Sequence, residues 1–150
     1  MKVIFTTDLL EYRKEHQTKL SADEWYGIIK TGSVPLDMIR KAKLDQLKKC
    51  CESAILAGFR SEQNDHLYSF GQYDQLNFTQ QMLVMLGDPS IDGMSWKTED
   101  AGLVQHSRNQ FLALCKEAEQ HKRSKMSKYW MLKEQVHAAQ SAEQLDKIIW

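Results

Sequence analysis

The chain has 150 residues, 42% hydrophobic and 27% charged, an ordinary composition for a soluble globular protein with one domain and a small appendage. Its 20 Lys and Arg residues balance 20 Asp and Glu residues, which argues against a general nucleic-acid binder and against electrostatic docking on anionic membranes. No apolar run approaches the roughly 20 residues of a transmembrane helix, so we expect neither nucleic acid nor a membrane among its partners.

Residues 1–32 are predicted to form a small separate unit. The apolar run between Met1 and Thr6 is too short for a signal peptide, and its residues are typical of a strand. Ser21 to Glu24 is a capping box that opens a short helix. Such a unit is too small to bury Trp25 and Tyr26 alone, so this pair is predicted to mark a partner-binding surface by which the unit anchors the protein.

A larger domain is expected over residues 33–150, with an α+β fold dominated by helices packed on one or two short β-hairpins. Apolar residues at three- and four-residue steps predict a helix over residues 35–57, which Gly58 would end. Strand-forming residues around a polar turn predict a hairpin over residues 59–71. A second helix is predicted over residues 73–86.

A second hairpin or extended pair is predicted over residues 91–106. Asp92 and Gly93 form a turn signal, and Trp96 and the Leu103-Val104 pair are the strand candidates.

Ser107 and Gln110 form another capping box, which predicts a long helix over residues 108–139. About 32 residues at 1.5 Å each span about 48 Å, which is long for a domain of this size. The middle, residues 121–125, is polar all round, so we expect it to lie in solvent or to pack on another subunit. Lys122 and Arg123 there could contact an acidic partner surface, although a solvated helix face is the commoner meaning of such a run.

The C-terminus ends on large apolar side chains, whereas most chain ends are small and polar. Ser141 and Gln144 have capping-box spacing, so a short helix is predicted to fold back after a sharp turn. Leu145, Ile148 and Trp150 would then dock onto the domain, with Trp150 as a plug.

Five short segments occur in an order that is typical of one family. They are Gly58 to Ser61, His66 to Ser69, Asp74 to Asn77, Trp96 to Ala101, and Leu145 to Trp150. With this ordered set, over roughly residues 40 to 150, the chain resembles a family of uncharacterised domains in tail and baseplate proteins of tailed bacteriophages and prophages. Ala101 stands where family members usually carry Asn, which weakens any specific role for a side chain at that position.

The resemblance implies a non-enzymatic structural or accessory component of a phage-type tail, at the baseplate or a tail fibre. Such a protein would enter the virion after synthesis in the bacterial cytoplasm, and its partners would be other tail, baseplate or fibre proteins. Tail organelles are built from cyclic oligomers, so a homo-oligomer is expected, and a trimer would match fibre symmetry. The alternatives are a fibre assembly chaperone that is absent from the mature particle and a glycan-binding module of the tail tip.

The residues that could be catalytic do not occur in patterns that predict an active site. Cys50, Cys51 and Cys115 are odd in number and are expected to be core thiols. No histidine has a partner at a recognised metal spacing, so we expect no metal and no cofactor. Glu99 and Asp100 could serve glycan cleavage, but adjacent strand residues project to opposite faces, and Asp100 is better suited to turning the backbone.

The aromatic residues are predicted to be core rather than a sugar-stacking platform. Together with the apolar residues of the C-terminal segment they form the predicted structural core: Phe59, Tyr68, Trp96, Trp130, Leu145, Ile148 and Trp150.

Overall fold

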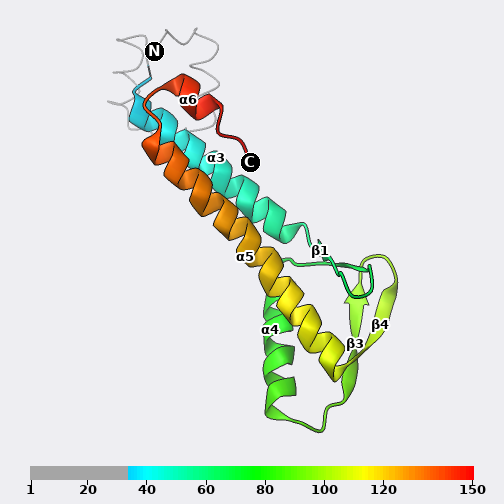
Figure 1. Ribbon diagram of the computed structural model, residues 1–150. Helices are drawn as coiled ribbons and strands as arrows, with labels where there is room; N and C mark the ends of the chain where they lie inside the picture. The colour runs from blue at the N-terminus through cyan, green and yellow to red at the C-terminus, as the bar shows by residue number, and fades with distance from the viewer. Residues whose placement is uncertain (1–33) are drawn as a thin grey trace. The chain divides into compact units, whose positions relative to one another are not determined.

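The computed structural model describes residues 34–150 (Figure 1). The predicted anchoring unit of residues 1–32, with Trp25 and Tyr26, lies outside the described residues and stays a prediction. The described elements, in chain order, are α3 (Leu36–Leu56), β1 (Phe59–Arg60), β2 (Leu67–Tyr68), α4 (Gln72–Gly87), β3 (Gly93–Thr98), β4 (Gly102–Ser107), α5 (Arg108–Ala138) and α6 (Ala142–Asp146). The predicted mostly helical α+β class is therefore confirmed.

The described residues fall into two compact units. Residues 34–48 and 130–150 belong to the first, and residues 49–129 form the second. The boundaries lie inside α3 and α5, so each of these helices contributes to both units. A regular helix carries no local sequence signal at such a boundary, and the predicted division between residues 32 and 33 stays a prediction.

In the first unit, the C-terminal segment is docked as predicted. Leu145 and Ile148 are buried. The Ser141 hydroxyl caps α6 by accepting a hydrogen bond from the Gln144 backbone N–H at 3.2 Å. The Gln144 side chain accepts from the backbone N–H of Gln140 at 2.7 Å rather than from that of Ser141, so the predicted capping box closes one residue earlier.

An arginine of α3 caps the C-terminal end of α5 in the same unit. The Arg40 guanidinium donates to the carbonyl oxygen of Ala139 at 2.5 Å and pairs with Asp37 at 2.6 Å. The last carbonyls of a helix have no partner within it and carry partial negative charge, so a cation is well placed there.

In the second unit, the first hairpin pairs Phe59 with Tyr68 and Arg60 with Leu67 in antiparallel register. The backbone of Gly58 has φ +85, so this residue ends α3 in the left-handed region, as the sequence predicted.

The second hairpin, β3 with β4, has its turn between the predicted strand candidates Trp96 and Leu103, and Asp92 and Gly93 do not form it. Thr98 and Gly102 are the last paired residues before the turn, and the Thr98 hydroxyl donates to the Gly102 carbonyl at 2.9 Å. Gly93 pairs with Ser107 at the open end of the hairpin. A Cβ at position 93 would overlap the His106 carbonyl oxygen, so this glycine serves a close approach of two strands and not a turn.

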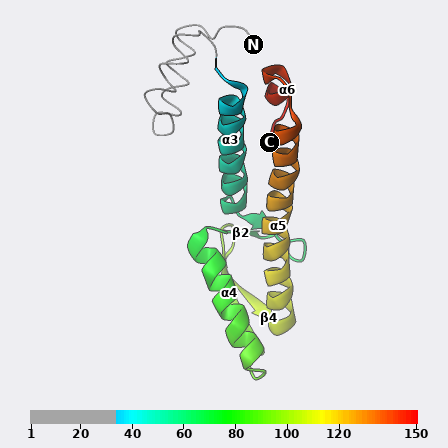
Figure 2. The same cartoon turned by 90° about the vertical axis from the view of Figure 1, so that its left-hand side faces the viewer.

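A continuous set of aromatic rings fills the second unit. Phe59 contacts Tyr68, Phe70 and Phe78 at ring-centroid distances of 5.7, 5.7 and 6.2 Å. Phe78 in turn stacks on Phe111 of α5 at 6.1 Å. Trp96 of β3 contacts both Phe78 and Phe111, so the rings join α4, both hairpins and α5. Figure 2 shows α4 beside the first half of α5.

The middle of α5 is exposed on one side, as expected for a solvated stretch, since Lys122, Arg123 and Ser124 are exposed, but its other side is packed within the second unit. The His121 ring contacts the Phe59 and Phe70 rings, each at 5.7 Å, and its Nε2 donates to the Ile55 carbonyl at 3.0 Å. The Cys51 thiol donates to the Lys125 carbonyl at 3.5 Å. Histidine counts as polar in a sequence pattern, yet its ring can be packed on one side and hydrogen-bonded on the other.

Candidate interaction surface

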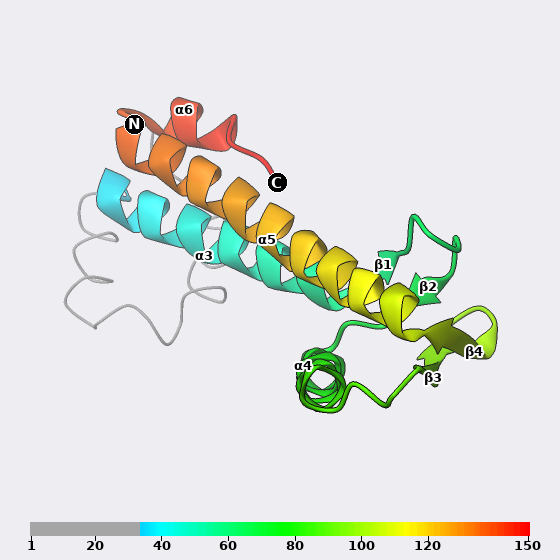
Figure 3. The ribbon, with the colours of Figure 1, turned by 60° about the horizontal axis from the view of Figure 1, so that its bottom comes forward.

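Helix α4 is apolar on two opposite faces. Its inward side chains Phe78 and Met85 are buried in the ring core. On the other side Leu76, Leu83 and Val84 are 52%, 61% and 55% exposed. A helix that is apolar all round is normally buried, so the outward face is the candidate interaction surface. Figure 3, in which α4 is seen end-on, shows the helix at the edge of its unit.

The outward face is defined by Tyr73, Leu76, Gln80, Leu83, Val84 and Gly87. Apart from Val84 these residues follow at steps of three and four, the spacing that aligns side chains along one side of a helix. The face carries no charged side chain, and Asp74 is the one charged residue of α4. The carboxylate of Asp74 accepts from the Gly71 backbone N–H at 2.8 Å and thereby caps the helix, so it belongs to the helix start.

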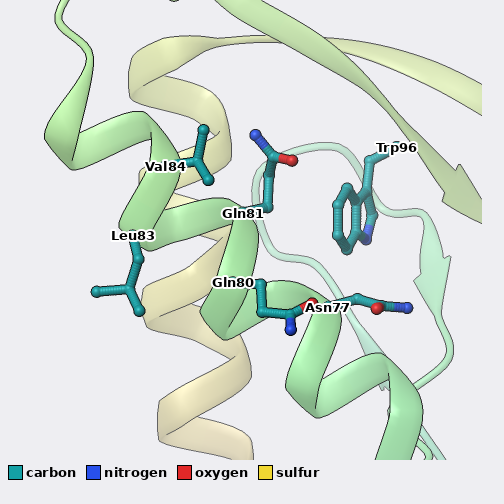
Figure 4. A pocket seen from close by; sticks show the side chains of 6 residues that line it. All are labelled: Asn77, Gln80, Gln81, Leu83, Val84 and Trp96. Atoms are coloured by element: carbon teal, nitrogen blue, oxygen red, sulfur yellow. The ribbon is translucent and has the colours of Figure 1, made fainter.

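A groove runs along one edge of this face (Figure 4). Its volume is about 700 Å³, and it is lined by Asn77, Gln80, Gln81, Leu83, Val84 and Trp96. Trp96, from β3, is fixed by ring contacts with Phe78 at 4.8 Å and Phe111 at 4.9 Å. The groove thus offers an apolar wall and amide groups, a combination suited to side chains of a protein partner.

A second, smaller pocket of about 380 Å³ lies between α4 and α5, with Phe70, Phe78 and Met82 among its apolar lining. Lys122 lies at its edge and donates to the Gln75 side-chain oxygen at 2.7 Å.

Both basic residues predicted to bind a partner are therefore engaged within the chain. Lys122 bonds Gln75, and Arg123 pairs with Glu119 at 2.6 Å one turn earlier on α5. The fold does not bring them to the outward face of α4, and their partner-binding role stays a prediction.

A polar cluster joins the tips of the two hairpins. Asp100 accepts from the Leu67 backbone N–H at 3.1 Å and lies 3.5 Å from His66 Nδ1 and 3.8 Å from an Arg60 nitrogen. The bond from Leu67 is the main cause that lowers the pKa of Asp100, and His66 contributes to the same shift. Asp100 therefore organises the backbone, as the sequence indicated, and Glu99 beside it lies in the turn rather than on a strand.

The buried thiols are poor nucleophiles. Burial raises the pKa of Cys115 to about 11. Burial, and then the nearby Glu52, raise the pKa of Cys51. A thiolate is the reactive form, so both groups are held unreactive at neutral pH.

Among residues 34–150, no group of three or more His, Cys, Asp or Glu residues is placed to hold a metal ion. No described helix is both long and apolar enough to cross a membrane.

The predicted core residues divide into three groups. Phe59, Tyr68, Leu145 and Ile148 are buried, which confirms their core positions. Trp96 and Trp150 are half-buried. Trp130 is 53% exposed, so its assignment to the core was wrong. It lies on α5 outside the series Leu132, Val136 and Ala139, which is the buried side of that end of the helix.

The outward face of α4 was missed in the sequence, although a signal was present. Leu76 and Leu83 are seven residues apart, as are Phe78 and Met85. These two pairs lie on opposite sides of a helix with 3.6 residues per turn. Two such stripes on one short helix predict apolar side chains on both sides of it, of which the core can cover one.

The fold defines a mostly helical α+β domain with two small antiparallel hairpins. The chain belongs to the family described as Domain of unknown function (DUF4376), which matches residues 38–149. No curated protein and no solved structure matches the chain. Membership of an uncharacterised family agrees with the coarser part of the sequence resemblance.

Proposed function

We propose that this protein is a non-enzymatic structural or accessory component of a phage-type tail, at the baseplate or a tail fibre, and that it docks on protein partners through the outward face of α4. The observation that carries the docking role is the uncharged, apolar character of this exposed face. The tail context is supported by the ordered segments from Gly58 to Trp150 that resemble tail and baseplate domains.

Burial of the outward face would supply the driving force for docking. Full burial of a Leu or Val side chain is worth about 1.5–3 kcal/mol, and Leu76, Leu83 and Val84 are each more than half exposed. Association also costs rotational and translational freedom. A contact on this face alone is therefore of moderate strength, as expected of one interface among several in a larger assembly.

The test is quantitative mass spectrometry of purified tail particles from a strain that encodes this chain. We expect the wild-type protein at a fixed ratio to the other tail proteins. The variant Leu83→Glu should be reduced or missing in the particles while it remains folded in the lysate, because it places a charge in the contact.

The matched control is Leu103→Glu. Leu103 is 74% exposed on β4, so the chemical change is the same but lies away from α4. Loss of both variants from the particles would count against a specific role of α4. Absence of the wild-type protein from particles, with a fibre protein bound to it in the lysate, would support an assembly chaperone instead.

The glycan-binding alternative gains no support from the described residues. Tyr68 is fully buried and Trp96 is held by core rings, so neither offers a free ring face. A sugar-stacking platform requires exposed ring faces.

A further inference from the structure

The pocket between α4 and α5 changes from apolar inside to charged at its mouth. Its volume is about 380 Å³, at the lower end of the roughly 300–1,000 Å³ that is typical of small-molecule sites. The half-buried side chains of Met82 and Leu112 lie at its sides. The buried lining residues form its floor: Phe70, Phe78, Cys115 and Ala118. The interior of the pocket therefore suits an apolar ligand body.

The charged lining residues Lys116, Glu119 and Lys122 are all exposed, so they surround the mouth. Lys122 Nζ donates to the Gln75 side-chain oxygen at 2.7 Å, which holds the ammonium group of an α5 residue against α4. An ammonium group carries three donors, so this bond leaves donors for a ligand. Glu119 pairs with Arg123 at 2.6 Å, and this pairing balances its charge. The mouth therefore has an excess of positive charge.

We infer that this pocket binds a small amphiphilic carboxylate, such as the anion of a medium-chain fatty acid. The apolar body lies against Phe78 and Met82, and the carboxylate lies at Lys122. The pocket is on a different side of α4 from the outward face, so the inference does not rest on the proposed function.

Charge and polarity select this class of ligand. A cationic head group would meet the like charges of Lys116 and Lys122. A sugar would lose its hydration against the apolar floor without gaining hydrogen bonds there. A carboxylate at the mouth gains a charge-assisted hydrogen bond from Lys122, while its alkyl chain leaves water.

The size of the pocket favours a small molecule over a protein segment. A stable protein contact buries roughly 800 Å² on each partner, which is more than one pocket of about 380 Å³ can provide. Within the carboxylates, each added methylene should tighten binding about fourfold until the pocket is full, because each one removes more apolar surface from water.

NMR of methyl-labelled methionine on the full chain tests the inference at the pocket itself. The probes are octanoate, 1-octanol and octylammonium, which share one alkyl chain and differ in the head group. We expect octanoate to shift the Met82 methyl resonance, which the variant Met82→Leu identifies by its loss. Octanoate should bind at least about tenfold more tightly than octylammonium, with 1-octanol between them.

Two lysine variants test the role of the head-group contact. Lys122→Gln removes the charge and should bring octanoate and 1-octanol to within about twofold of each other, whereas Lys122→Arg keeps the charge and should keep the preference. The matched control is Lys97→Gln, on an exposed lysine of β3 outside the pocket, which should bind like wild type.

A tryptophan at the mouth tests the place of binding. Thr79 is exposed and lines the pocket, so Thr79→Trp should obstruct it and weaken all three probes at least about tenfold. Gln80→Trp is the control, because the next residue of α4 is also exposed but does not line this pocket. Circular dichroism confirms that each variant is folded.

Three outcomes would overturn the inference. They are an unshifted Met82 methyl resonance with octanoate, equal affinities of the wild-type protein for octanoate and octylammonium, and an unchanged preference for octanoate in Lys122→Gln. None of these outcomes affects detection of the protein in tail particles, so failure of ligand binding and failure of the proposed tail role are separate results.

Discussion

The hydroxyl of Tyr68 lies 2.7 Å from Nε2 of His106, and both side chains are buried. His106 Nδ1 lies 2.8 Å from the Val104 carbonyl oxygen, which can only accept, so Nδ1 carries the ring proton and Nε2 accepts from Tyr68. The Asn64 side-chain amide donates to the same hydroxyl at 2.8 Å. The two hairpins are thus joined through polar groups that satisfy one another.

Removal of the Tyr68 hydroxyl should therefore be costly. In Tyr68→Phe, His106 Nε2 and the Asn64 amide each lose a partner, and we expect the free energy of unfolding to fall by about 1–3 kcal/mol. Urea unfolding followed by circular dichroism measures this. Tyr73→Phe is the control, because Tyr73 is 84% exposed and should change stability by less than about 0.5 kcal/mol. Equal effects of the two substitutions would contradict the network.

Gly58 is predicted to tolerate no side chain. Its φ of +85 disfavours any L-residue, and a Cβ there would overlap the Tyr68 carbonyl oxygen. We expect Gly58→Ala to lower the free energy of unfolding by at least about 2 kcal/mol. Gly87→Ala, at the open end of α4, should raise stability by up to about 1 kcal/mol. Both are measured in a Leu83→Glu background, to exclude an effect of association on the second substitution.

Local backbone chemistry could be predicted from the sequence, because it depends on a few neighbouring residues. Gly58 as a helix end and the capping boxes at Ser107 and Ser141 are of this kind, and each fixed an element boundary to within one residue. The helices over 35–57 and 108–139 followed from apolar periodicity together with these end signals.

The remaining features depend on contacts between distant residues. The close approach at Gly93 requires β4 beside it, so Asp92 and Gly93 alone resembled a turn. The outward face of α4 was missed because Leu76 and Phe78 are equally apolar, and only the packing of the ring core shows which one points inward. Trp130 was predicted to be in the core because it is large and hydrophobic. In the folded protein Leu132 is buried on that part of α5 and Trp130 is exposed.

The capping box at the start of α5 should contribute measurably to stability. The Ser107 hydroxyl accepts from the Gln110 backbone N–H at 3.3 Å, and the Gln110 side chain accepts from the Ser107 N–H at 2.8 Å. We expect Ser107→Ala to cost about 1 kcal/mol in chemical unfolding. Ser124→Ala, inside α5, should be neutral or slightly stabilising, because alanine favours helix interiors. A larger loss at Ser124 than at Ser107 would argue against the cap.

The three thiols should react at different rates with a thiol reagent. Cys50 is half-buried, whereas Cys51 and Cys115 are buried, with pKa values raised by burial and that of Cys115 at about 11. At about pH 8, where an ordinary thiol is partly ionised, one fast and two slow reactions are expected in the native protein. Cys50→Ser should remove the fast reaction, and denaturant should make the remaining two fast. A fast reaction at Cys115 in native protein would reopen the question of a catalytic cysteine.

The hairpin-tip cluster should make stability depend on pH through Asp100. The pKa of the Asp100 carboxyl is lowered in the folded protein, mainly by the hydrogen bond from the Leu67 backbone N–H. The stabilisation by the ionised Asp100 carboxylate is therefore fully present above the unfolded-state pKa of about 4 and is lost as the pH falls through the folded-state pKa. Urea unfolding at several pH values should find Asp100→Asn less stable than wild type at about pH 7, with the difference shrinking as the pH falls below about 4. The control is Asp146→Asn, on an exposed residue of α6, and this substitution should leave the wild-type acid profile in place. Asn keeps an acceptor oxygen for the Leu67 N–H and differs from Asp mainly in charge. If the difference in unfolding free energy between wild type and Asp100→Asn stays constant across the acid range, the carboxylate charge does not contribute to stability.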